Sequence, residues 1–151
     1  MLLCSLSAMA QKNEPKMQRI YMFGFAASFT DSVAYQTDIQ QIDSAWLDKH
    51  KMLVDRSLYS LQLQWFLESA KHKKNTTCTV FFATKPNKLE RRWKKVQKRF
   101  QNVEGLHLHK LERDEFAFKA EEYRPIIMEE DTATTAPISP VVPKASPSAG
   151  K

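Results

Sequence analysis

The chain has 151 residues, 42% of them hydrophobic, and its 23 basic and 17 acidic residues give a formal net charge of +6. This apolar content excludes wholesale disorder, and the length suits one domain with a modest core. The excess of positive charge suggests anionic partners without requiring them. With only three glycines the chain has no glycine-rich phosphate loop, which argues against an enzyme that uses nucleotides.

The opening sequence MLLCSLSAMAQ has the pattern of the end of a secretory signal peptide: an apolar run followed by A-x-A. We expect residues 1–10 to be a signal remnant, cleaved between Ala10 and Gln11, and 11–18 to be flexible. Because no basic residue precedes the apolar run, we also expect the natural start to lie before Met1. Export to the periplasm or outer envelope follows. The alternative is a cytoplasmic protein with a ragged N-terminus. No stretch reaches the roughly 18 apolar residues of a membrane span.

The first structural pattern is RIYMFGFAASF, over 19–29, which is nearly continuously apolar and predicts a central strand covered on both faces. The alternating sequence VAYQTDI, over 33–39, predicts a half-buried strand that forms a hairpin with it. Asp43 and Ser44 are typical of a helix N-cap, and Asp55 is a second candidate. We therefore predict one long or broken helix over 44–71.

The second half of the chain alternates strands with a helix. TTCTVFFAT, over 76–84, is β-branched and aromatic and predicts a strand. Pro86 suits the first turn of a helix, and apolar residues at helical spacing continue to about Asn102. LHLHKL, over 106–111, alternates as a strand, with EFAFKAEEY, over 115–123, as a candidate extension.

This order, β-β-α-β-α-β, predicts an α/β (α+β) two-layer sandwich with a mixed sheet of about four strands, formed by one domain over 19–123. Residues 124–151 are rich in Pro, Ala, Ser and Thr and predict a disordered tail. The strand order and the oligomeric state do not follow from the sequence.

The helix predicted over 85–100 carries the clearest functional signal, because eight basic residues and one acid lie between Lys85 and Arg99. A solvated outer face is one interpretation. The other is a site for phosphate or sulfate groups or for an anionic membrane surface. The candidate anion-binding residues are Arg91, Arg92, Lys94, Lys95, Lys98 and Arg99.

Three weaker patterns also contain residue types that can carry chemistry. His107 and His109 point the same way in a strand and could share a metal ion. The candidates for a third ligand are His72, Glu112 and Asp114. The alternative is that the two histidines lie on the solvent-exposed side of an edge strand. Cys78 lies in an apolar run and predicts a small buried residue rather than a catalytic thiolate. The last pattern is a possible acid/base set whose convergence the sequence does not reveal: Asp31, Asp38 and Asp43.

Three segments, FGFAASFTDSVAYQTDIQ, RSLYSLQLQWFLE and TTCTVFFATK, resemble small exported proteins of Gram-negative bacteria that have no assigned activity. The resemblance covers residues 17–118 and implies export and a single domain. It carries over no catalytic residue and does not extend to the tail.

The leading functional hypothesis is a small exported protein with a non-catalytic binding or structural role in the cell envelope, with no cofactor expected. An anion-binding module for polysaccharide, lipid headgroup or nucleic acid, using residues 85–100, is the alternative. Its partner would be an anionic envelope component. A metal-assisted enzyme that uses His107 and His109 is the second alternative.

Overall fold

The computed structural model describes residues 13–125, and the predicted signal remnant, its cleavage site and the tail from residue 126 onward lie outside this range. Its elements are β1 (Lys16–Ala27), β2 (Val33–Thr37), β3 (Gln40–Leu47), α1 (Arg56–Ala70), β4 (Thr77–Ala83), α2 (Pro86–Gln101) and β5 (His107–Leu111). The predicted α+β class is confirmed, with one mixed sheet of five strands and two helices.

The long strand β1 is the centre of the sheet. Tyr21 pairs with Gln41 of β3 and with Ala83 of β4, and Ala26 pairs with Tyr35 of β2 and with Cys78 of β4. Strand β4 therefore lies along one edge of β1, and β2 followed by β3 lies along the other, all antiparallel to it. Strand β5 adds to β2 in parallel. The predicted β1–β2 hairpin is confirmed.

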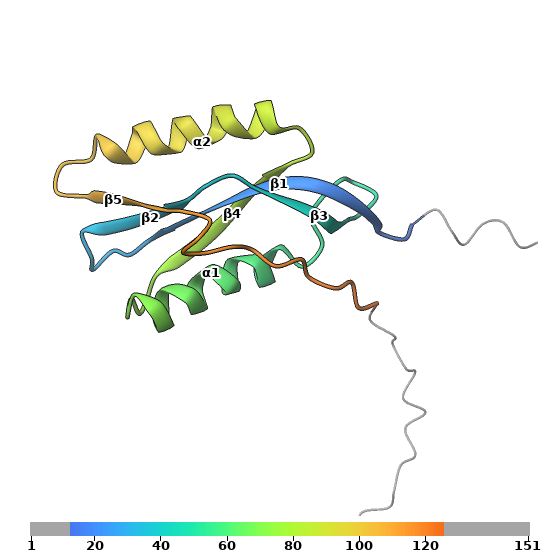
Figure 1. Cartoon of the computed structure of the whole chain (residues 1–151), viewed down its shortest axis with the longest axis horizontal. Helices are drawn as coiled ribbons and strands as arrows, with labels where there is room; N and C mark the ends of the chain where they lie inside the picture. The colour runs from blue at the N-terminus through green and yellow to red at the C-terminus, as the bar shows by residue number, and fades with distance from the viewer. Residues whose placement is uncertain (1–12, 126–151) are drawn as a thin grey trace, which may run out of the picture.

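The two helices cover opposite faces of the sheet, α1 below it and α2 above it (Figure 1). Phe23 and Phe25 therefore face the α2 side, where their rings contact Phe81 and Phe100, while Met22 and Ala26 face the α1 side. The sheet is the middle of three layers, whereas the sequence predicts two layers and about four strands. The apolar run of β1 was correctly interpreted as a strand covered on both faces.

The prediction of a helix over 44–71 is wrong in its first part. Residues 40–47 form β3, and only Arg56–Ala70 is helical. The cause is a β-bulge: Arg19 of β1 lies opposite two residues, Asp43 and Ser44, because the pairing shifts by one there. This shift interrupts the alternation of buried and exposed residues along the strand. The resulting sequence pattern resembles the start of a helix. Asp43 forms an ion pair with Arg19 at 2.7 Å instead of capping a helix.

Strand β1 begins at Lys16, inside the segment 11–18 that was expected to be flexible. Lys16, Met17 and Gln18 pair with the end of β3. Since β3 was not predicted, no partner strand for these three residues was visible in the sequence.

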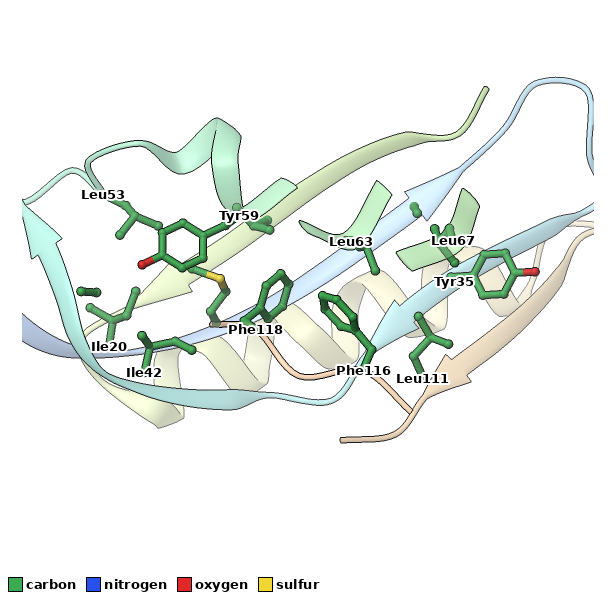
Figure 2. Close-up of a cluster of buried hydrophobic side chains, with 14 of the residues drawn as sticks. Ile20, Tyr35, Ile42, Leu53, Tyr59, Leu63, Leu67, Leu111, Phe116 and Phe118 are labelled. Atoms are coloured by element: carbon green, nitrogen blue, oxygen red, sulfur yellow. The ribbon is translucent and has the colours of Figure 1, made fainter. Parts of the chain in front are cut away.

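Residues 112–125, here called the strap, follow β5 and lie on the same face of the sheet as α1 (Figure 1). The candidate extension of the strand over 115–123 is wrong, because this stretch has no regular structure. Instead, Phe116 and Phe118 insert into the core (Figure 2). Gln40 holds the strap by donating to the carbonyl of Phe116 and accepting from the amide of Phe118, each at 2.8 Å.

The main core lies between α1, the strap and the sheet. Helix α1 contributes Tyr59, Leu63 and Leu67, whose spacing of four places them on one buried face (Figure 2). Gly24 of β1 makes room for this packing, because a Cβ atom would lie only 2.7 Å from Leu63 Cδ2 and 3.0 Å from Phe118 Cζ, so that these side chains would have to shift. Within residues 13–125, neither helix combines the length and hydrophobicity that crossing a bilayer requires.

Candidate anion-binding site

Helix α2 is attached to the sheet by one apolar side and one tryptophan. Pro86 occupies the start of the helix, where its missing N–H is not needed. Leu89 is only 1% exposed. The Trp93 indole donates to the carbonyl of Thr37 at 2.8 Å, and the Gln36 side chain donates to the carbonyl of Trp93 at 3.0 Å. These contacts fix which side of α2 faces solvent.

The six predicted anion-binding residues all lie on that solvent side and are exposed. None of them forms an ion pair with any acid of residues 13–125. Cations elsewhere do find acids: Lys73 lies 2.5 Å from Asp31, and Lys110 lies 3.0 Å from Asp38. Exposed cations without an acidic partner also occur elsewhere, for example Lys16, Lys49 and Lys74, but within residues 13–125 the six on α2 lie together on one helix face.

This charge pattern opposes the stability of the helix itself. The first turn contains no acid, although the positive end of the helix dipole favours one, and its N-cap is Lys85. Four like-charged pairs have i,i+4 spacing: Lys88–Arg92, Arg91–Lys95, Lys94–Lys98 and Lys95–Arg99. At about 0.2–0.5 kcal/mol each, they destabilise the helix by roughly 1–2 kcal/mol. Lys98 and Arg99 recover part of this at the C-terminal end.

A groove of about 420 Å³, here called the α2–β4 groove, lies between one side of α2 and strand β4. Three of the six cations, Arg92, Lys95 and Arg99, line it, and Arg92 lies over the ring of Phe81 at 5.5 Å. Its remaining lining residues are Phe25, Thr79, Phe81, Val96 and Phe100. Positive charge and apolar surface are thus combined in one site.

The aromatic part of this groove was missed by sequence reasoning. Phe25 and Phe81 come from strands that were predicted correctly, but their shared face depends on the antiparallel pairing of β1 with β4. The sequence does indicate that Phe81 and Thr79 lie on one face of a strand, because they are two residues apart. Which helix covers this face could not be read from the sequence.

The structure gives little support to a metal centre at the histidines. His107 and His109 are exposed on the edge strand β5, and His109 Nε2 lies 3.9 Å from Glu115. The other neighbour of His109 is the ring of Tyr35, at 5.5 Å between centroids. Across residues 13–125, no three His, Cys, Asp or Glu side chains come together as metal ligands.

The three aspartates considered for acid/base chemistry each bind a different cation rather than one another. The hydrogen bond from Lys73 lowers the pKa of Asp31. Hydrogen bonds from Gln41 and Arg19 lower the pKa of Asp43. Asp38 pairs with Lys110. The lowered pKa values of Asp31 and Asp43 favour their ionised forms, which are poor general acids at neutral pH.

Cys78 provides a test of the core on the α1 side. Burial raises the pKa of its thiol, so the reactive thiolate is scarcer at any given pH than in the unfolded chain. We expect Cys78 to react with iodoacetamide at pH 8 at least several-fold more slowly in the folded protein than in denaturant. Mass spectrometry of the peptide containing Cys78 measures this rate separately from that of Cys4. Equal rates in both conditions would contradict the burial.

No family model, no curated protein and no solved structure matches this chain.

Proposed function

We propose that this is a non-catalytic binding protein of the cell envelope whose α2 face binds a polyanion. The observation that carries the proposal is the set of six exposed cations on α2 without an acidic partner among residues 13–125.

The competing interpretation is a solvated face with no ligand. Such faces usually mix both signs of charge, because acids near bases add a few tenths of a kcal/mol per pair. Helix α2 does the opposite and contains Glu90 as its only acid. A local arrangement that opposes stability is expected at sites where function requires it. An anionic ligand would remove the repulsion and release counterions.

The test is a titration of fluorescently labelled dextran sulfate, followed by anisotropy at 50–200 mM NaCl, with uncharged dextran as the control. We expect the logarithm of affinity to fall with the logarithm of salt concentration by about 0.7–0.9 per cation neutralised. The triple variant Arg91→Gln, Lys94→Gln, Lys98→Gln should therefore lower this slope by about 2–3.

A matched variant separates local charge from net charge. Lys16→Gln, Lys49→Gln, Lys74→Gln removes three exposed lysines outside α2 and, like the α2 triple, changes the net charge from +6 to +3. It should leave the slope nearly unchanged. Equal losses in both variants would show that only overall charge matters, and no binding at the lowest salt would reject the proposal.

We also propose export, on the support of the A-x-A pattern at residues 8–10. N-terminal sequencing of the protein isolated from its natural source is the measurement. A start at Gln11 is the expected result, and an intact Met1 would contradict export.

A further inference from the structure

The α2–β4 groove has two chemically different parts. Its floor consists of apolar side chains, with Thr79 as the only uncharged polar residue among those that line it. Its rim consists of Arg92, Lys95 and Arg99, and no acid lines it. Apolar surface left in water is unfavourable, while the rim cations favour a negative group close to that surface.

A ligand of only one kind would satisfy half of this site. A sulfate or phosphate group alone would pair with the rim cations and leave the apolar floor exposed to water. A neutral hydrocarbon would cover the floor and remove water from cations that gain no partner, which is unfavourable. An amphiphile with a negative group at the end of an apolar chain satisfies both parts at once.

The orientation of the aromatic rings favours an alkyl chain over a nucleobase. Stacking of a base requires a free ring face. Phe81 stacks on Phe23 at 4.9 Å and lies under Arg92, and Phe25 contacts Phe100 with ring centroids 4.3 Å apart. Phe81 thus has a contact on its ring from both Phe23 and Arg92, and Phe25 and Phe100 are tilted against each other. A flexible chain can pack against the ring edges and the side chain of Val96 that remain.

We infer that the α2–β4 groove binds the hydrocarbon chain of an anionic lipid, with the lipid's charged group held by Arg92, Lys95 and Arg99. This inference rests on the proposed function of α2 and specifies its ligand class. The outer cations Arg91, Lys94 and Lys98 do not line the groove. They attract the surrounding anionic surface without touching the bound chain.

The test is isothermal titration calorimetry with inorganic phosphate, octyl phosphate and decyl phosphate, each below its critical micelle concentration. Each buried methylene is worth about fourfold in affinity, so decyl phosphate should bind roughly 15-fold more tightly than octyl phosphate. Arg92→Gln, Lys95→Gln, Arg99→Gln should weaken both alkyl phosphates. The equally charged variant Arg91→Gln, Lys94→Gln, Lys98→Gln removes cations that do not line the groove and should weaken them severalfold less.

Two substitutions on one face of β4 isolate the groove. Thr79→Phe fills it and should remove the gain from the longer chain, whereas Thr77→Phe, two residues away and outside the lining, should keep it. Val96→Asn replaces an apolar residue of the floor on the helix side with a polar one. Like Thr79→Phe, it should remove the gain in affinity from the longer chain. Circular dichroism confirms that each variant is folded.

Dextran sulfate binding, measured on the same variants, separates the two hypotheses. If Thr79→Phe keeps it while losing the chain-length effect, both hypotheses stand. If the wild-type protein binds dextran sulfate but shows no gain from octyl to decyl phosphate, the lipid inference is overturned and the proposed function is kept. Loss of single-stranded DNA binding in Thr79→Phe would assign the groove to nucleic acid and overturn the inference as well.

Discussion

Replacing Phe118 with alanine is expected to lower the free energy of unfolding by about 3–5 kcal/mol. Phe118 is 7% exposed and packs edge-on against Phe116, with ring centroids 4.8 Å apart. It also approaches Tyr59, and its ring reaches the space above Gly24. Glycine has no side chain to fill the cavity, so the surroundings cannot close easily. Since small domains are stable by only about 5–15 kcal/mol, this variant should be close to unfolding at physiological temperature.

Chemical denaturation with urea, followed by circular dichroism, measures this loss. Phe29→Ala is the matched control, because Phe29 is fully exposed after the end of β1. Its substitution should change the free energy of unfolding by less than about 0.5 kcal/mol. A similarly small effect at Phe118 would show that the strap does not belong to the core.

Replacing Gln40 with alanine should lower the free energy of unfolding by roughly 2–6 kcal/mol, although no charge is removed. Gln40 is 2% exposed, and its amide satisfies both the carbonyl of Phe116 and the amide of Phe118. Without this side chain, two buried backbone groups lose their partner, and each unsatisfied group costs about 1–3 kcal/mol. The strap should also exchange its amide hydrogens faster, which identifies where the stability is lost.

The neighbouring glutamine provides the control. Gln41 lies on the exposed side of β3 and bonds only to Asp43, at 2.8 Å. Gln41→Ala should therefore change stability by less than about 0.5 kcal/mol, and it keeps the strand position and the residue type matched. If the two variants are equally stable, water replaces the Gln40 amide and the strap is not held by it.

The strap explains the largest effects and was also the hardest part to predict. Its sequence EFAFKAEEY alternates as a strand does, and Phe116 and Phe118 do share one buried side. However, its long-range hydrogen bonds go to the side chains of Gln40, Tyr59 and Gln62 rather than to a neighbouring strand. These side-chain partners lie 57 to 78 residues away in the sequence, so the local pattern of apolar and polar residues cannot reveal them.

The error over residues 44–47 has a similar origin. A bulge adds one residue to β3, so that burial alternates up to Ile42 and resumes at Ala45 in the opposite phase. The interruption places Asp43 and Ser44 where a helix cap would be expected. Pairing with β1 decides in favour of the strand, because Ala45 and Leu47 then enter the core.

By itself, the sequence determined the elements whose own residues carry a full periodic pattern. These were β1, β2, β4, β5, α2 and the second part of the 44–71 segment, together with the basic face of α2. Each signal is local, because the spacing of apolar and charged residues within one helix or strand fixes which sides of that element differ.

Only the tertiary structure decided how those sides meet. It placed α1 and α2 on opposite faces of the sheet, made β3 from a segment that resembles a helix start, and brought Phe25 and Phe81 together beneath the cations of α2. The physical reason is that burial is a property of pairs of surfaces. A periodic pattern shows that one side of an element avoids water, but the partner that covers it comes from elsewhere in the chain.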